Sequence, residues 1–339
     1  MKIGIVTIYD FYNQGNRLQN YALEQVLIKM GHEVETFAIT PKKIYIFYLK
    51  LGKLFPCKRT RRIKNCQKWS DKYLHQRIID SCTFEELKER AKSFDYFVVG
   101  SDQVFNPRII ADENVTFLKF VEKEKALAYA PSFGVEKLAD ELKPKFVEGL
   151  SHISGLSVRE NEGAKLIKEL IGKDVPVLVD PTMLLTKEDW ESFSKLKPVK
   201  EKYILTYFLN PKSEYKKKVK KIAKENNLKV ININSNLDKY YTSDPCEFVG
   251  LMRNADMICT NSFHGTVFSI MLEKPFIYFD TSRDTKSRIK TLLSKMHLEN
   301  RNNLKIDKND YFSVDFSFAK NQLEEERKKS AEFLKSVLK

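Results

Sequence analysis

Short apolar runs alternate with helix-length segments along nearly the whole chain, and this alternation restricts the fold more than any other feature. Short runs bounded by polar residues are typical of strands buried in a parallel sheet, and the segments between them repeat apolar residues at helical spacing. The predicted strands are 3–8, 33–38, 96–99, 126–129, 155–158, 203–208, 229–233, 257–259 and 276–279. Strands that alternate with helices predict an α/β protein built from doubly wound, Rossmann-like parallel sheets.

The chain is long enough for two such domains. A length of 339 residues suits about two cores, and the polar stretch 194–202 has the composition of a linker. We therefore expect a first domain at 1–195 with a basic insertion at 41–80, and a second at 196–319. A charged amphipathic helix at 320–339 is expected to pack back on the first domain.

The first strand leads into a polar loop, 9–16, and then into a helix predicted over 17–30, with Gly31 in the C′ position. The loop contains Asn13, Gly15 and Asn16 but no GxGxxG motif. This unit is therefore not expected to bind a dinucleotide in the usual way.

Polar residues also follow two later strands of the first domain. Asp102 and Asn106 come after strand 96–99, and Arg159 comes after strand 155–158. The carboxyl ends of parallel strands form the ligand-binding edge of such sheets, and an arginine there suits a carboxylate or a phosphate. The structural alternatives are an Asx-turn at Asp102, and an ion pair of Arg159 with Glu160 or Glu162.

A histidine occupies the corresponding place in the second domain. Thr260, Asn261 and Ser262 are good N-cap types, so His264 is predicted in the first turn of a helix that continues through 267–272. Helix starts attract anions, and histidine can move a proton near neutral pH. His264 is thus a candidate ligand for phosphate or carboxylate, the alternative being a side chain that only caps the turn.

Composition argues for a cytoplasmic protein. Charged residues make up 31% of the chain, mean hydropathy is −0.42, and we find no apolar run of about 18 residues. The N-terminus enters a strand directly, unlike a signal peptide. The five cysteines have no CxxC spacing, so neither a metal site nor a disulfide framework is expected.

The net charge of +14 is concentrated in one segment. Residues 42–72 hold eleven Lys or Arg and one Asp, a net +10, interleaved with aromatic and aliphatic residues. This pattern suits peripheral contact with an anionic membrane. The alternative is a helical pair that packs on the protein with a solvated basic face, and nucleic-acid binding is not expected.

Six motifs occur in a fixed order and together resemble the polysaccharide pyruvyl transferase family. They are N-Q-G-N-R-L-Q-N-Y-A-L at 13–23, V-V-G-S-D-Q-V-F-N-P at 98–107, the 129–134 turn, S-V-R-E at 157–160, the 180–190 segment and N-S-F-H-G-T-V-F-S-I at 261–270. The resemblance covers about residues 3–295. It implies a GT-B-like pair of domains with the active site in the cleft between them.

The resemblance also implies a reaction. The donor is phosphoenolpyruvate, no further cofactor is used, and the acceptor is a sugar of a surface glycan or of its lipid-linked precursor. The basic segment 42–72 is expected to help the enzyme meet a lipid-linked acceptor at the inner face of the membrane. Arg159 is expected to clamp the donor carboxylate or phosphate, and His264 to bind phosphate and act as general acid. Asp102 is expected to orient or deprotonate the acceptor hydroxyl.

The remaining residues carried over from the motifs are expected to bind substrate: Asn13, Gly15, Asn16, Arg17, Ser101, Gln103, Asn106, Ser262, Gly265, Thr266 and Arg283. Asn16 stands where some family members carry an acidic residue, so hydrogen bonding to substrate is expected there and not base catalysis. Two alternatives stay open. One is a GT-B-type nucleotide-sugar glycosyltransferase of surface polysaccharide synthesis, and the other is a non-catalytic binding protein driven by the 42–72 segment.

Overall fold

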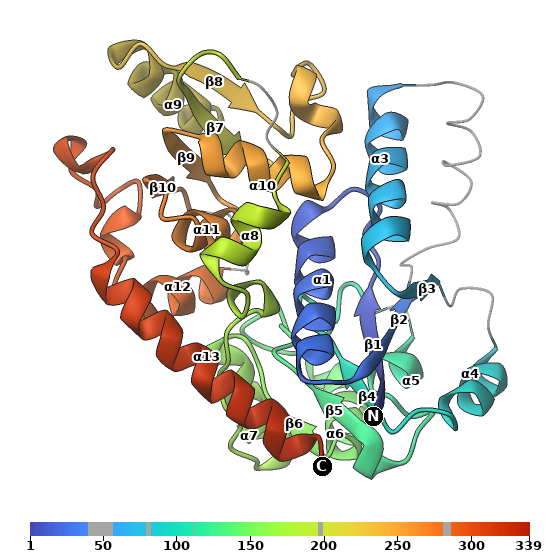
Figure 1. The fold of residues 1–339 in the computed structure, drawn as a ribbon. Helices are drawn as coiled ribbons and strands as arrows, with labels where there is room; N and C mark the ends of the chain where they lie inside the picture. Colours follow the sequence, from blue (N-terminus) through green and yellow to red (C-terminus); the bar gives the residue numbers. More distant parts are fainter. Residues whose placement is uncertain (40–56, 79–82, 111, 196–198, 281–285) are drawn as a thin grey trace. The chain divides into compact units, whose positions relative to one another are not determined.

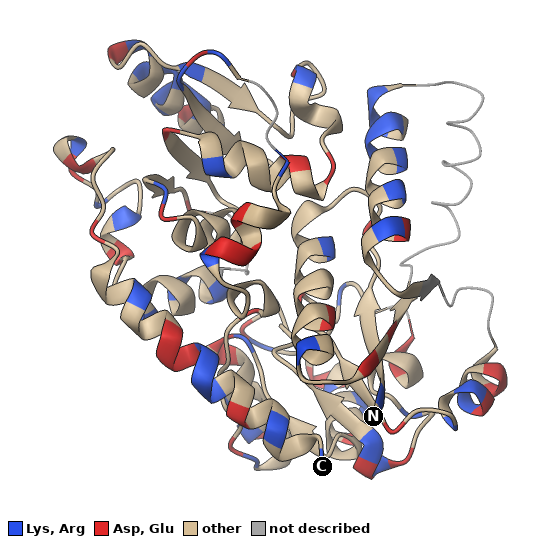
Figure 2. Cartoon of the chain, viewed as in Figure 1, with Lys and Arg blue, Asp and Glu red and all other residues tan. Residues whose placement is uncertain are grey.

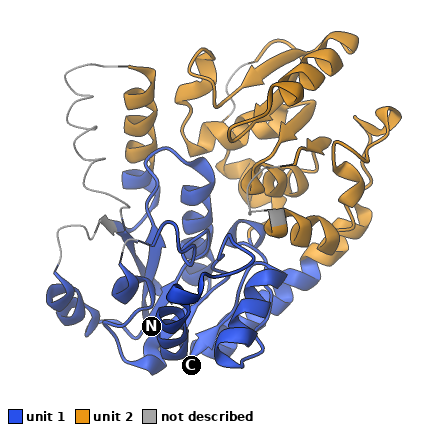
Figure 3. Cartoon of the chain, turned by 180° about the vertical axis from the view of Figure 1, so that it is seen from behind, with its two compact units in different colours: residues 1–50, 70–184, 324–339 blue, residues 51–69, 185–323 orange. Residues whose placement is uncertain are grey.

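The computed structural model describes residues 1–339 apart from 40–56, 79–82, 111, 196–198 and 281–285. The chain splits into two compact units (Figure 3). Unit 1 comprises Met1–Lys50, Ser70–Leu184 and Glu324–Lys339, and unit 2 comprises Leu51–Trp69 and Leu185–Leu323. The division falls inside α3 (Lys58–Tyr73) and α13 (Ser317–Val337), so both helices contribute residues to each unit.

Unit 1 contains a six-stranded parallel sheet in the order β3-β2-β1-β4-β5-β6 (Figure 1). This is the strand order of a Rossmann-like sheet. The strands are β1 (Lys2–Ile8), β2 (Glu33–Ile39), β3 (Gln76–Ile78), β4 (Tyr96–Val99), β5 (Ala126–Ala128) and β6 (Gly155–Leu156). The strand at 76–78 is an addition to the prediction, because the segment 41–80 was expected to be an insertion outside the sheet.

Helices cover both faces of this sheet, since neighbouring residues of its strands enter different cores. Ile5 and Val98 belong to one apolar cluster, and Val6 and Val99 belong to another. The helices are α1 (Gln14–Lys29), α4 (Phe84–Ala91), α5 (Glu113–Thr116), α6 (Lys143–His152) and α7 (Asn161–Ile171), and Leu334 of α13 and Leu338 just after it pack on the same core. The doubly wound arrangement predicted for the first domain is confirmed.

Helix α1 begins three residues earlier than the prediction of 17–30. The side chain of Asn13 accepts a hydrogen bond from the backbone amide of Asn16, which makes Asn13 the N-cap. The first turn is polar and carries no apolar repeat, so helical periodicity did not reveal it. Gly15 and Asn16 therefore lie on a helix and not in a loop.

Unit 2 contains a four-stranded parallel sheet in the order β10-β9-β7-β8. The strands are β7 (Tyr203–Tyr207), β8 (Lys229–Asn232), β9 (Met257–Thr260) and β10 (Phe276–Tyr278). The helices are α8 (Lys187–Phe193), α9 (Ser213–Glu225), α10 (Pro245–Asn254), α11 (Phe263–Met271) and α12 (Lys286–Lys295). A second α/β unit is thus confirmed, and a capping box of Thr186 with Asp189 begins α8.

The chain between α12 and α13 is irregular apart from two short 3-10 turns, and the side chain of Arg301 anchors it. This side chain is 1% exposed and donates hydrogen bonds to the backbone carbonyls of Phe276, Asp310, Ser313 and Tyr311 at 2.9–3.3 Å. One buried guanidinium therefore fastens this irregular segment to β10. Among the described helices, none has the length and apolar character needed to cross a membrane.

Candidate active site

Two loops meet at the carboxyl edge of the unit 1 sheet, after β1 and after β4. The amide of Gly100 donates to the carbonyl of Val6 at 2.7 Å and extends the ladder between the strands. Asp102 then adopts a left-handed backbone with φ of 62°, a conformation that Asp and Asn tolerate better than most residues. This turn leaves the carboxylate of Asp102 buried at the sheet edge.

Arg159 lies against two carboxylates at the same edge. Its side chain is buried, its Nη1 bonds to the Asp180 carboxylate, and its Nη2 lies 3.6 Å from Oδ1 of Asp102. Burial alone would lower the pKa of Arg159, but the charges of Asp180, Asp102 and Glu160 outweigh it and raise that pKa. The arginine is therefore a permanent cation, with Asp180 and Asp102 as its ion-pair partners.

Asp180 reaches this position through a short parallel bridge. Val158 pairs with Val177, and the amide of Leu178 donates to the carbonyl of Val158 at 2.8 Å. The chain then turns, and Oδ1 of Asp180 accepts from the backbone amide and the hydroxyl of Thr182 at 3.0 and 2.7 Å. Its other oxygen, Oδ2, faces Arg159 and accepts from Ser101 at 3.1 Å. Asp180 is thus fixed on both sides.

Asn16 and Asp10 complete this group of side chains. Nδ2 of Asn16 donates to Oδ2 of Asp102 at 3.2 Å, and Oδ1 of Asn16 accepts from the amide of Asp10 at 3.2 Å. Burial raises the pKa of Asp10, and the nearby charge of Asp102 adds to this, against opposing hydrogen bonds from the Tyr12 and Asn13 amides and the charge of Arg17. Asp10 thus retains a proton to higher pH than an ordinary aspartate.

Arg17 holds the loop after β1. Its guanidinium donates to the carbonyls of Asp10 and Phe11 and to the hydroxyl of Ser70, and it stacks on the ring of Tyr9. These contacts give it a structural task. The substrate contact expected for Arg17 stays a prediction.

The loop after Asp102 packs on the 130–134 turn. Nδ2 of Asn106 donates to Oε1 of Gln103 at 2.8 Å, and a Cβ at Gly134 would lie 2.5 Å from that oxygen. Oε1 of Glu160 accepts from the hydroxyl of Ser132 and the amide of Phe133, both at 2.9 Å. Glu160 therefore shapes this turn and is not the main ion-pair partner of Arg159.

In unit 2 the start of α11 is built as the sequence predicts. Ser262 is the N-cap and accepts from the amide of Gly265, so His264 lies in the first turn. Its side chain is 5% exposed, and its ring meets the ring of Phe263 edge-on. The guanidinium of Arg288, on α12, lies 5.8 Å from the centre of the Phe263 ring. A histidine, a helix start and an arginine therefore occur together in this unit.

Close packing fixes this helix start on the sheet. The hydroxyl of Thr260 donates to the carbonyl of Tyr207 at 2.7 Å and accepts from the amide of Ser262 at 3.0 Å. A Cβ at Gly265 would lie 2.2 Å from that hydroxyl oxygen, so a larger residue does not fit without a shift. The hydroxyl of Thr266 donates to the carbonyl of Ser262 at 3.0 Å.

The structure thus brings together Ser101, Asp102, Arg159 and Asn16 in unit 1, and Ser262, His264, Gly265 and Thr266 in unit 2. Arg283 lies outside the described residues. Sequence reasoning missed Asp10 and did not name Asp180 as a site residue. The available signal was their position, since Asp10 comes two residues after β1, which ends at the same edge as β4, and Asp180 follows the apolar run 175–179.

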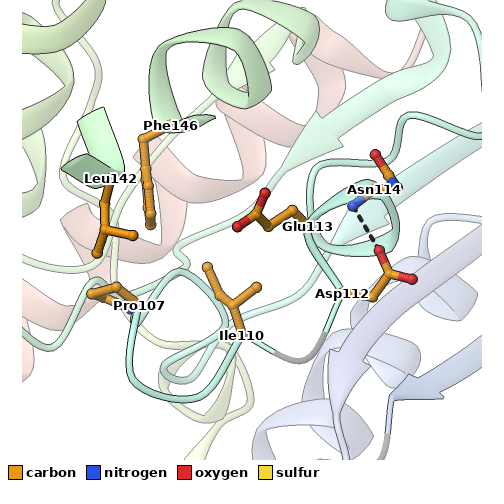
Figure 4. A pocket seen from close by; sticks show the side chains of 7 residues that line it. All are labelled: Pro107, Ile110, Asp112, Glu113, Asn114, Leu142 and Phe146. Atoms are coloured by element: carbon orange, nitrogen blue, oxygen red, sulfur yellow. Dashed lines mark hydrogen bonds between the residues drawn. The ribbon is translucent and has the colours of Figure 1, made fainter. Parts of the chain in front are cut away.

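A separate pocket of about 310 Å³ lies further along the chain in unit 1. Its lining residues are Pro107, Ile110, Asp112, Glu113, Asn114, Leu142 and Phe146 (Figure 4). Asp112 lies on the side of the pocket away from Leu142 and Phe146. Its carboxylate caps α5 there by accepting a hydrogen bond from the Asn114 amide at 2.8 Å. None of the predicted catalytic residues lines this pocket. Within the described part of the chain, no group of three His, Cys, Asp or Glu side chains is arranged to hold a metal ion.

Comparison with known proteins gives a family and a fold. The sequence model of the polysaccharide pyruvyl transferase family matches residues 13–283. No curated protein matches the chain in sequence. A proposed UDP-N-acetylglucosamine 2-epimerase from Listeria monocytogenes is similar in structure, with a TM-score of 0.50 at 12% identity over 95% of this chain and 94% of that chain.

Two further structures give lower scores. The UDP-GlcNAc 2-epimerase from Methanocaldococcus jannaschii has a TM-score of 0.48 at 15% identity over 95% of this chain and 98% of that one. MurG from Acinetobacter baumannii has a TM-score of 0.47 at 9% identity over 99% of both chains. At such identities the likeness to the Listeria protein concerns the fold alone. Together with the two parallel sheets, it confirms the predicted GT-B-like α/β fold.

Proposed function

This chain belongs to the polysaccharide pyruvyl transferase family, which makes it a transferase of polysaccharide biosynthesis, and on that premise we propose its reaction. It transfers the enolpyruvyl carbons of phosphoenolpyruvate to a sugar of a cell-surface glycan or its lipid-linked precursor, forming a pyruvate ketal across two hydroxyls. The family match carries the proposal, because residues 13–283 include Asp102, Arg159 and His264.

The chemistry sets what the site must provide. One sugar hydroxyl adds to C2 of the donor while C3 takes up a proton, and a second hydroxyl then replaces phosphate at C2. Of the two hydroxyl protons, one is balanced by the proton gained at C3 and the other leaves with phosphate. The reaction therefore needs a base for the hydroxyls, an acid for C3 and positive groups for the phosphate. No cofactor takes part in this scheme.

The features of unit 1 support handling of the acceptor. Sugar hydroxyls bind well to carboxylates and amides, and Asp102, Asn16 and Asp10 supply these at one sheet edge. We assign the base to Asp102 and the acid for C3 to Asp10, because burial raises the pKa of Asp10.

Arg159 is assigned as the residue that holds Asp102 and Asp180 in place. The alternative is that Arg159 binds the donor directly. Arg159 would then have to break its ion pair with Asp102 or Asp180 and bind the carboxylate or phosphate of the donor instead.

The features of unit 2 support handling of the phosphate. The start of α11 presents the positive end of a helix, and His264 and Arg288 lie in the same region. His264 is proposed to bind the donor phosphate and to protonate it as it leaves. The lipid-linked acceptor would be met at the cytoplasmic face of the membrane.

Binding of the donor is the first test. Phosphoenolpyruvate is expected to raise the melting temperature of the purified chain in a concentration-dependent way, since a ligand present at about 100 times its Kd stabilises the folded state by about 2.7 kcal/mol. A panel of nucleotide sugars is titrated in parallel. Stabilisation by a nucleotide sugar and none by phosphoenolpyruvate would overturn the proposal in favour of a glycosyltransferase. The product is checked by mass spectrometry of the glycan, which should gain pyruvate less one water.

His264→Ala is expected to lower phosphate release by about a hundredfold, the usual effect of removing one stabilising donor from a transition state. The assay follows inorganic phosphate with donor and acceptor present. His297→Ala is the matched control, because His297 is an exposed histidine in the same unit that stacks on Phe318. Wild-type rates for a folded His264→Ala chain would exclude the assigned role.

A further inference from the structure

Helix α3 carries most of the described basic segment, and one side of it packs on other described residues of the protein. Ile63, Cys66 and Trp69 are buried, and Nε1 of Trp69 donates to Sγ of Cys246 at 3.1 Å. Asn65 donates to the carbonyl of Thr242 at 2.8 Å. These contacts fix the rotation of α3 about its axis, so its opposite side is a defined surface of unit 2.

That opposite side is a row of cations. Arg61, Lys64 and Lys68 are exposed, and their spacing of three and four residues places them on one helix face. Lys58–Tyr73 contains seven Lys or Arg and one Asp (Figure 2). Within the described residues, no ion pair to Arg61, Lys64 or Lys68 is found. The row therefore presents uncompensated positive charge.

An exposed leucine lies on the turn that α3 contacts. Leu237 is 89% exposed, and the next residue in the turn, Asp238, accepts a hydrogen bond through its carbonyl from Nζ of Lys58 at 3.3 Å. The carboxylate of Asp238 is directed inward, where it accepts from the amides of Asn232 and Tyr240, both at 2.9 Å. The turn therefore exposes Leu237 and its neighbour Lys239 to solvent, while the carboxylate of Asp238 is hydrogen-bonded within the turn.

We propose that this surface of unit 2, formed by Arg61, Lys64 and Lys68 of α3 with Leu237 and Lys239 of the adjoining turn, docks on an anionic lipid surface. Cations meet the headgroup phosphates while the leucine enters the interface between headgroups and acyl chains. A nucleic acid would use the cations but offers no apolar layer for Leu237. The proposal does not depend on the identity of the donor.

Helix α9 provides a matched control in the same unit. Lys217, Lys220 and Lys224 are exposed and repeat the spacing of Arg61, Lys64 and Lys68. We define an α3 triple variant (Arg61→Gln, Lys64→Gln, Lys68→Gln) and an α9 triple variant (Lys217→Gln, Lys220→Gln, Lys224→Gln). Both remove three charges from one helix face, so they differ in position and not in net charge.

The test is co-sedimentation of the full chain with phosphatidylcholine vesicles, with and without phosphatidylglycerol. Wild-type chain and the α9 triple variant are expected to bind only the anionic vesicles, and less so as salt is raised. The α3 triple variant is expected to lose about a hundredfold in vesicle affinity. Equal losses in both triple variants, or no loss in either, would overturn the proposal.

Leu237→Ser tests whether the chain inserts Leu237 into the lipid interface or is held at the membrane by charge attraction alone. It leaves the net charge unchanged and is expected to weaken binding to anionic vesicles about tenfold, because one leucine no longer enters the interface. Unchanged vesicle binding by this variant would overturn the proposal that Leu237 enters the lipid interface. Binding of a duplex oligonucleotide is measured as well, and tighter binding of the wild-type chain to the oligonucleotide than to anionic vesicles would overturn the lipid proposal. Thermal melting of each variant confirms that the comparison is between folded chains.

Discussion

Asp102→Asn is expected to lower the rate of phosphate release, measured with donor and acceptor present, by about a thousandfold. Asparagine tolerates the left-handed backbone found at φ of 62°, and its side-chain oxygen can still accept from Asn16. It cannot take a proton from a sugar hydroxyl. The rate should therefore fall while the fold is kept.

The control for this variant is Asp112→Asn in the same unit. Asp112 caps α5 by accepting from the amides of Asn114 and Val115, and asparagine caps a helix about as well as aspartate. Its rate should equal that of the wild type. If a folded Asp102→Asn chain retains activity within roughly tenfold of the wild type, Asp102 is not the general base.

Residues whose role is set by local sequence could be predicted. Strand β4 was predicted with its observed bounds, Tyr96–Val99, because it is a short apolar run between polar residues. His264 was placed in the first turn of a helix because Ser262 and its neighbours are good N-caps. The capping box at Thr186 likewise depends on two residues three positions apart. All of these signals lie within one turn or one strand.

Residues whose role depends on distant partners could not be predicted. The sequence offered Glu160 and Glu162 as ion-pair partners for Arg159, because they are its neighbours, whereas the structure pairs it with Asp102 and Asp180. Asp180 arrives only because Val177 bridges to Val158, which no local pattern reveals. Arg301 was missed for the same reason, since its four carbonyl partners lie on separate segments.

Arg159 is expected to stabilise unit 1 by pairing with two buried carboxylates. Arg159→Met is expected to lower the free energy of unfolding of unit 1 by about 3–5 kcal/mol, because Asp180 and Asp102 lose their cation while they remain buried. The loss should be larger at about pH 8 than at about pH 5, since unpaired buried carboxylates take up protons as the pH falls. Arg159 itself adds no such dependence in the wild type, because its raised pKa keeps it charged throughout this range.

Arg301→Met is the matched control for this pH dependence. Arg301 is also buried, but its partners are backbone carbonyls, which do not titrate. Burial lowers the pKa of Arg301 to about 10, so it too stays charged between about pH 5 and pH 8. Its replacement should therefore destabilise the chain by a similar amount at both pH values. The same pH dependence in both variants would contradict the carboxylate explanation.

Hydrogen exchange shows which segments lose stability in Arg159→Met. In Arg159→Met, amides of the segments 96–106 and 176–186 should exchange faster, because these segments carry the two carboxylates that the arginine holds. Adding Asp180→Asn should restore part of the stability, because it removes one of the stranded charges. The free energy of unfolding is also measured for Asp180→Asn alone. If the losses of the two single variants simply add in the double variant, the two residues do not interact.

Kinetics of a milder variant separate the two tasks considered for Arg159. Arg159→Lys keeps a charge but loses the planar fork that spans two carboxylates, so the chain should fold while Asp102 is held less well. A positioning residue then predicts a lower kcat and a shifted pH profile, with the KM for phosphoenolpyruvate nearly unchanged. A donor clamp predicts the reverse, a raised KM with the pH profile of kcat kept. Because Arg159 lies between Asp102 and Asp180 in the structure, the first pattern is the expected one.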